Sequence, residues 1–148
     1  MTEPDVEGTP MDEHEDAASA IAAARTETGR RRYREVMVSD APPPVTPYLD
    51  KGVVDSVFGE LWDRPGLARR DRRWVTLACV AAAAVDEPIQ QHVYAALASG
   101  DITREEFQEF VLHFAYYAGW PRASSLEMAY YRAIARIDGD VSDPGVGA

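Results

Sequence analysis

The sequence predicts an all-α fold with about six helices, and three observations support this prediction. Apolar residues recur at spacings of three and four along most of residues 25–137, and no segment alternates convincingly like a half-buried strand. Short segments that contain proline or glycine separate these stretches. Hydrophobic residues make up 46% of the 148 residues, which is enough to build a core.

The net charge of −10 is confined to the two ends of the chain. Residues 1–24 contain seven acidic residues and no Lys or Arg, and residues 138–148 contain three acidic residues and no base. The remaining 15 acidic and 15 basic residues balance within residues 25–137. We therefore expect a disordered acidic tail over 1–24, one helical domain over 25–137 and a flexible acidic tail over 138–148. A neutral domain argues against binding to nucleic acid.

The first half of the chain predicts two helices joined by a stiff linker. An Ala-rich segment favours a helix over about 17–38, with Gly29 as a candidate break, after a mobile segment over 1–16. Four prolines exclude regular structure from residues 39–47. Apolar spacing then predicts a helix over 49–62, and Pro65-Gly66 marks the turn that follows.

A long helix is expected over about 68–85, and its second half is apolar on every side. Such a segment should be buried all round, so we infer an oligomer in which partner chains cover part of it. Its single cysteine, Cys79, is expected to be a buried and inert thiol. The longest apolar stretch has nine residues, too few to span a membrane, and no secretory signal is recognisable; we expect a cytoplasmic protein.

Three further helices are predicted in the second half. Asp86 and Pro88 open a helix that runs to about residue 99. Thr103 and Glu106 form a capping-box pattern that opens a helix to about residue 118. Pro121 opens the last helix, which ends near residue 137.

His92 is the first candidate for chemistry, because it lies on or beside the apolar stripe of its helix. The pattern favours a buried histidine satisfied by a neighbour, while an acid–base role is the alternative. Arginines around residues 64–73 fit either an anion site or a solvated turn with Asp63 and Asp71 as counter-ions. Glu109, His113 and Tyr117 are most simply a hydrogen-bond ladder. No ligand spacing indicates a metal site.

Several motifs in order resemble the carboxymuconolactone decarboxylase family. They are the segment 58–67 (FGELWDRPGL), Arg70-x-Arg72, VTLA at 75–78, HVYAAL at 92–97, the segment 100–106 (GDITREE) and AYYAGWPRA at 115–123. The resemblance covers about residues 48–135. It implies an all-α bundle like that of alkyl hydroperoxidase D and assembly into a homo-trimer or homo-hexamer.

The resemblance also separates this chain from the redox branch of that superfamily. That branch uses a Cys-x-x-Cys pair, whose positions fall here on Val85 and Pro88, and an acidic relay residue, whose position falls near Arg73. Thiol peroxidase activity is therefore not expected.

The decarboxylase branch implies a cofactor-free lyase of aromatic-acid catabolism that acts on a small carboxylated lactone or oxo-acid. At the family motif positions, His92 would be the proton donor, and Arg72 and Glu60 would be further catalytic residues. Arg64, Arg70, Tyr117 and Trp120 would bind the substrate. The alternatives are an isomerase, hydratase or cyclase on a hydrophobic carbonyl compound, or a non-catalytic oligomeric scaffold that binds small molecules.

Overall fold

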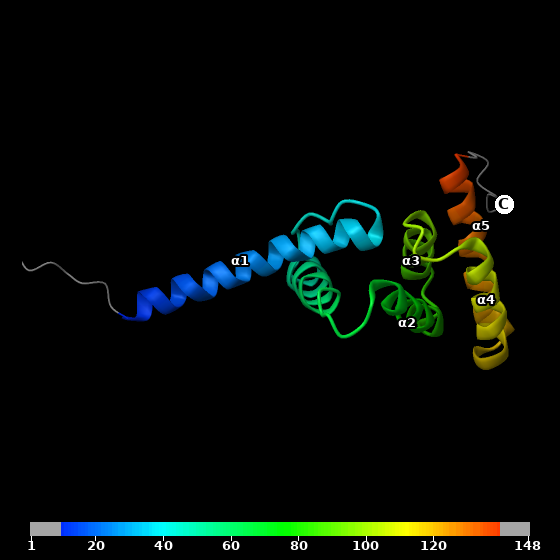
Figure 1. Ribbon diagram of the computed structural model, residues 1–148, viewed down its shortest axis with the longest axis horizontal. Coiled ribbons are helices and arrows are strands. Elements are labelled where there is room, and N and C mark those ends of the chain that lie inside the picture. Colours follow the sequence, from blue (N-terminus) through cyan, green and yellow to red (C-terminus); the bar gives the residue numbers. More distant parts are fainter. Residues whose placement is uncertain (1–9, 140–148) are drawn as a thin grey trace, which may run out of the picture. The chain divides into compact units, whose positions relative to one another are not determined.

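All regular structure is helical in the part of the chain that the computed structural model describes, residues 10–139 (Figure 1). Five α-helices and one π-helix occupy this range, and it contains no strand. The predicted all-α class with about six helices is thus confirmed. The outermost parts of the two predicted acidic tails, 1–9 and 140–148, lie outside the described residues. No helix within residues 10–139 combines the length and the apolar character needed to cross a bilayer.

The described chain divides into two compact units. The first contains the residues up to Arg32 together with Ala41–Asp63, and the second contains Tyr33–Asp40 together with the residues from Arg64 onward. The division falls within α1 (Pro10–Met37). The predicted domain of residues 25–137 therefore includes parts of both units.

Helix α1 begins at Pro10 rather than near Ala17, and it passes through Gly29 without a break. Proline is favourable in the first turn of a helix, so the helix can begin well before its Ala-rich part. Gly29 is buried against the backbone of Val54, where any Cβ atom would overlap with the Val54 carbonyl. Its role is therefore close packing between segments.

The partner of α1 in the first unit is η1 (Tyr48–Leu61), a π-helix where the sequence spacing predicted an α-helix. Gly52 and Gly59 weaken the α-helical preference of this segment. Asp55 is buried at 6% exposure and accepts hydrogen bonds from Thr26 Oγ1 at 2.7 Å and Lys51 Nζ at 3.1 Å. Burial alone would raise the pKa of the Asp55 carboxyl, but these bonds outweigh it and hold the pKa below its usual value.

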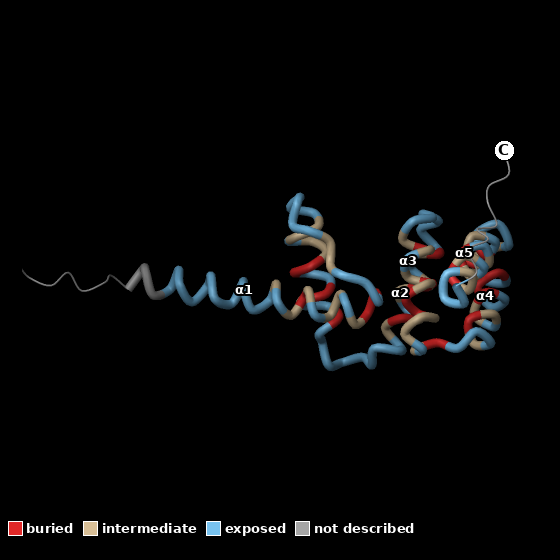
Figure 2. The backbone as a smooth tube through the Cα atoms, turned by 90° about the horizontal axis from the view of Figure 1, so that it is seen from above, coloured by how far each residue is buried: buried red, intermediate tan, exposed pale blue. Residues whose placement is uncertain are grey.

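The second unit contains four α-helices: α2 (Arg69–Ala83), α3 (Asp86–Ala98), α4 (Arg104–Ala118) and α5 (Trp120–Asp138). Helix α5 packs mainly against α3 and α4, and α2 packs mainly against α3. Each helix alternates between buried and exposed residues (Figure 2). The fully or nearly fully buried core includes Leu77, Ala81, Ile89, Val93, Ala96, Ile102, Phe107 and Leu126.

The helix boundaries in this unit follow the local chemistry. Both hydrogen bonds of the capping box between Thr103 and Glu106 are present, which confirms that prediction. Gly119, with φ of +97°, separates α4 from α5. Left-handed Ala84 ends α2 at Ala83, two residues earlier than expected.

The apolar half of α2 is not buried all round within this chain. Leu77 and Ala81 are buried, whereas Val75 is 55% exposed and Cys79 is exposed. The prediction of a buried Cys79 is wrong, because the residue lies two positions from both Leu77 and Ala81 and therefore faces away from the core.

Candidate functional site

His92 lies half-buried on α3, beside the row formed by Ile89, Val93 and Ala96. Burial lowers its pKa from 6.5 to about 4, and the positive charge of Arg73 contributes in the same direction. The imidazole is therefore neutral near pH 7. In this state the ring combines one hydrogen-bond donor with one acceptor.

Arg73 is the buried cation that acts on His92. It lies on one stripe of α2 with Leu77 and Ala81, at successive spacings of four, and is only 2% exposed. Its Nε donates to Asp101 Oδ2 at 2.6 Å, and its Nη2 donates to the carbonyl oxygen of Val36 at 2.7 Å. Its third nitrogen, Nη1, is buried and has no hydrogen-bond partner within residues 10–139. The guanidinium of Arg73 therefore retains a buried N–H donor that no group in the described residues satisfies.

Asp101, in the turn between α3 and α4, is the counter-ion of Arg73. It also receives two hydrogen bonds from Arg69, at 2.9 Å from Nε and 2.6 Å from Nη2. Burial would raise the pKa of Asp101, but the bonds from Arg69 and Arg73 outweigh it and lower the pKa. One carboxylate thus pairs with two guanidinium groups. We call His92, Arg69, Arg73 and Asp101 the Arg73 cluster.

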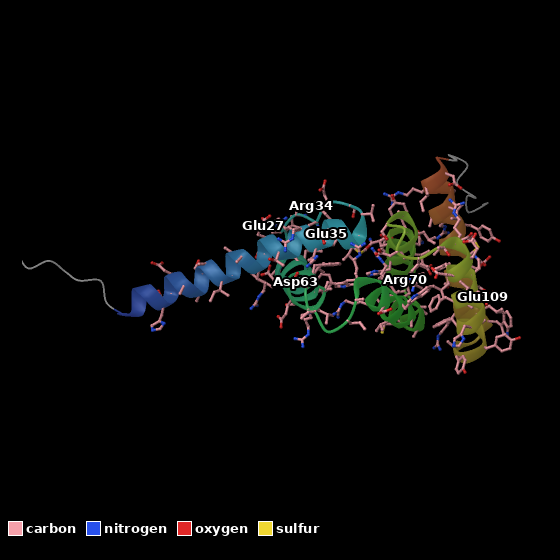
Figure 3. All side chains as sticks on the ribbon, viewed as in Figure 1. Glu27, Arg34, Glu35, Asp63, Arg70 and Glu109 are labelled. Carbon is pink, nitrogen blue, oxygen red and sulfur yellow. The ribbon has the colours of Figure 1, made fainter. Side chains whose placement is uncertain are left out.

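The arginines that the sequence singled out point to different partners. Arg70, labelled in Figure 3, pairs with Glu106 and donates from Nε to the carbonyl oxygen of Asp101 at 3.0 Å. Arg72 donates from Nη2 to the carbonyl oxygen of Arg64 at 3.1 Å. Thus Arg70 and Arg72 hold the start of α2 to neighbouring segments, while Arg73 alone among them is buried.

The counter-ions of this arginine group differ from those expected for a solvated turn. Asp63 was expected to be a local counter-ion of these arginines. It instead accepts a hydrogen bond from Arg32 Nε at 2.6 Å within the first unit. Asp101 and Glu106, both distant in sequence, take this role for Arg69, Arg70 and Arg73. The expectation that Asp63 neutralises the arginines at the start of α2 is therefore wrong.

The other predicted site residues do not line a common cavity with His92 in the part of the chain that the structure describes. Glu60 is exposed and belongs to the first unit, whereas His92 belongs to the second. Tyr117 is 84% exposed and stacks on His113, with ring centroids 4.7 Å apart. Trp120 is 62% exposed and lines a groove between α4 and α5.

The residues of the second unit form several depressions, and His92 lines none of the five main ones in the described chain. The largest, about 550 Å³, is a shallow groove between α2 and α4 that includes Glu109 (Figure 3). Its lining is aromatic and acidic: Trp74, Glu106, Glu109, Phe110, Leu112, His113 and Tyr116. Within residues 10–139, no group of three His, Cys, Asp or Glu side chains has the arrangement to hold a metal ion.

Asp101 is the residue of this site that sequence reasoning missed. Arg73 was also not predicted as a site residue, although the nearby Arg64, Arg70 and Arg72 were. Arg73 carries a readable signal, because its spacing of four from Leu77 and eight from Ala81 places it on the buried stripe. Asp101 carries no comparable local signal, since its bond to Arg73 joins residues 28 positions apart.

Comparison with known proteins relates this chain to decarboxylases. The sequence model of the carboxymuconolactone decarboxylase family matches residues 47–130. A 4-carboxymuconolactone decarboxylase of Acinetobacter baylyi is 37% identical over 68 residues, which are 46% of this chain and 50% of that protein. The nitrosuccinic acid decarboxylase npaB of Metarhizium robertsii is 32% identical over 87 residues, which are 57% of this chain and 60% of that protein.

The matched region thus spans half to three fifths of the length of these relatives. The family match covers more than half of this chain, including η1, α2, α3, α4 and most of α5. The chain belongs to the carboxymuconolactone decarboxylase family.

Proposed function

We propose that the chain is a cofactor-free lyase that removes CO2 from a small carboxylated lactone or oxo-acid. Two relatives are named as decarboxylases, one for 4-carboxymuconolactone and one for nitrosuccinic acid. The observation that carries the proposal is the buried guanidinium of Arg73, with its unpartnered Nη1, acting on a neutral His92. A buried positive charge with a spare donor suits a carboxylate or the oxyanion that develops when CO2 leaves.

The proposed reaction consumes one proton in each turnover. The bond between the carbon and the carboxylate breaks, CO2 leaves, and the electron pair moves into the neighbouring carbonyl group as an enolate. A proton from His92 then forms the new C–H bond, and His92 recovers a proton from solvent. Because His92 is neutral in the free protein near pH 7, it must gain this proton when the anionic substrate binds.

The remaining predicted site residues keep proposed roles as family motif positions. Arg72 and Glu60 would assist catalysis, and Arg64 and Arg70 would contribute to binding of the carboxylate. Tyr117 and Trp120 would shape the site, and their exposure leaves their rings accessible to a ligand or to another subunit.

We also propose that the protein is a homo-trimer or homo-hexamer and that a neighbouring subunit completes the site. Val75 on α2 and Tyr116 and Tyr117 on α4 are between 55% and 84% exposed. Covering these apolar and aromatic side chains would stabilise an assembly. A neighbour over this unit would also supply the walls that His92 lacks in the isolated chain. Light scattering tests this proposal, and a monomer at micromolar concentration would contradict it.

Release of CO2 from 4-carboxymuconolactone by the purified protein tests the proposed reaction. His92→Asn should lower kcat by at least ~100-fold if the histidine supplies the proton. Arg72→Ala tests the predicted catalytic arginine, and Arg104→Ala, on an exposed ion pair with Asp138, is the control. No CO2 from the parent protein with this lactone or with a panel of oxo-acids would refute the lyase proposal. Conversion of a substrate without CO2 would favour an isomerase or hydratase.

A further inference from the structure

A second cavity in the described chain lies between α4 and α5. This α4–α5 groove has a volume of about 270 Å³ and takes one row of side chains from each helix. Its lining residues are Gln108, Val111, Leu112, Ala115, Trp120, Ala123, Ser124 and Glu127. The volume lies just below the ~300–1,000 Å³ of sites for drug-sized molecules, so it suits a compound with one ring.

The floor and rim of the groove are apolar. Val111, Ala115 and Ala123 are each less than 10% exposed and form part of the core. Leu112 and Trp120, which are 47% and 62% exposed, stand at its edges. An exposed indole beside an apolar floor offers a flat surface on which a ring can stack.

Gln108 gives the groove a polar anchor. The side chain is half-buried, and its Nε2 atom is buried without a hydrogen-bond partner in the described residues. A buried amide atom without a partner is unfavourable, so a ligand that bonds to it gains affinity.

Glu127 sets the charge that the groove accepts. Its carboxylate accepts a hydrogen bond from the Tyr131 hydroxyl. The lining contains no basic residue that would balance this negative charge. An anionic ligand would therefore be disfavoured, while an N–H or O–H group on a neutral ligand finds an acceptor.

We propose that the α4–α5 groove, which shares Trp120 with the residues proposed to shape the lyase site, is a second site for a small neutral ring compound that carries both a carbonyl group and an N–H or O–H group. The ring would lie against Ala123 and Trp120, and the polar groups would bond to Gln108 and Glu127. This preference is opposite to that of the Arg73 cluster, where the unpartnered Nη1 of the buried Arg73 favours an anion. The two sites would therefore take different classes of molecule.

Benzamide is a suitable probe because it combines one ring with a carbonyl and an amide N–H group. Binding is measured by NMR on the full ¹⁵N-labelled chain, through the side-chain amide of Gln108 and the indole N–H of Trp120. Benzamide should shift both signals in a saturable manner, and benzoate, with the same shape and a negative charge, should bind at least ~tenfold more weakly. Toluene tests the apolar floor alone.

Two variants separate the anchor from the groove. Gln108→Leu keeps the bulk of the side chain and should weaken benzamide at least ~tenfold while toluene binds as before. Ser124→Leu fills the mouth of the groove and should weaken both probes. Gln91→Leu, at an exposed glutamine on α3 outside the groove, is the matched control and should leave both probes unchanged. Circular dichroism checks that each variant is folded.

Four results would overturn the proposal. Benzamide could fail to shift the groove signals, or it could bind Gln108→Leu as tightly as the parent protein. Benzoate could bind as well as benzamide, which would show that Glu127 does not select the charge. Groove signals that respond to protein concentration but not to benzamide would assign the groove to a second copy of the chain instead.

Discussion

Nε of Arg73 donates to Oδ2 of Asp101 across 2.6 Å, and this bond joins the buried stripe of α2 to the turn between α3 and α4. The arginine side chain is 1% exposed and the aspartate side chain is 11% exposed. A second bond, from Nη2 to the carbonyl oxygen of Val36, ties the end of α1 to the same guanidinium. Burial lowers the pKa of Arg73, and Asp101 opposes that effect, so the pair keeps a charged residue in the interior.

Asp101→Asn should destabilise the fold by ~3 kcal/mol in free energy of unfolding. The change leaves the buried charge of Arg73 without a neutralising carboxylate, which costs far more than the pair itself contributes. Urea unfolding followed by circular dichroism measures the loss.

The matched control is Asp138→Asn, which removes the carboxylate from the exposed bond between Asp138 and Arg104 at 2.6 Å. Exposed ion pairs contribute about 0–1 kcal/mol, so this variant should unfold close to the parent. Equal losses in the two variants would show that burial of Arg73 does not make its counter-ion important.

Arg73→Met should raise the pKa of His92 above about 4 while leaving it below 6.5. The substitution removes the positive charge that disfavours the imidazolium, but the burial that is the larger cause of the lowered pKa remains. Titration of the His92 ring signals by NMR measures the change. Arg70→Met removes a more exposed guanidinium from the same helix and is the control. An unchanged His92 pKa in Arg73→Met would refute the electrostatic link between the two residues.

Stability should increase with pH between about 4 and 6.5 because of His92. The unfolded chain binds a proton at His92 below pH 6.5, whereas the folded chain does so only near pH 4. Within this window the unfolded state holds more protons, so lowering the pH costs up to ~1.4 kcal/mol per pH unit in free energy of unfolding.

Urea unfolding at a series of pH values measures this slope. His92→Gln should reduce the slope between pH 4 and 6.5, since the amide does not titrate. His113→Gln removes a histidine from an exposed position on α4 and controls for the loss of a ring. The same slope in His92→Gln as in the parent would contradict the lowered pKa.

The number and order of the helices could be predicted because each depends on a local pattern. The capping box at Thr103 and Glu106 needs residues only three positions apart, and the structure contains it as expected. The π-helical geometry of η1 could not be predicted, because apolar spacing of three and four does not distinguish it from an α-helix. The exposure of Cys79 was missed because a nearly continuous apolar run hides which face packs inward.

The site was harder to predict than the fold because its residues meet over long distances in sequence. His92 and the arginine group stand out by residue type alone. The choice between Arg72 and Arg73 depends on which face of α2 is buried, and the Leu77 and Ala81 spacing contains that information. Asp101 joins the site only through the folded arrangement of α2 against the turn after α3, which no local pattern encodes.

Gly29→Ala should destabilise the first unit by ~1–3 kcal/mol, although alanine favours helices by ~1 kcal/mol over glycine. The added Cβ would overlap with the backbone carbonyl of Val54, which cannot turn away as a flexible side chain could. Gly66→Ala is the matched control, since a Cβ there meets nothing within 4 Å. Urea unfolding of both variants measures the difference, and the indole N–H signal of Trp62 in NMR spectra follows the first unit. If Gly29→Ala were as stable as Gly66→Ala, then α1 and η1 would not pack closely at Gly29, and the glycine would have no structural role there.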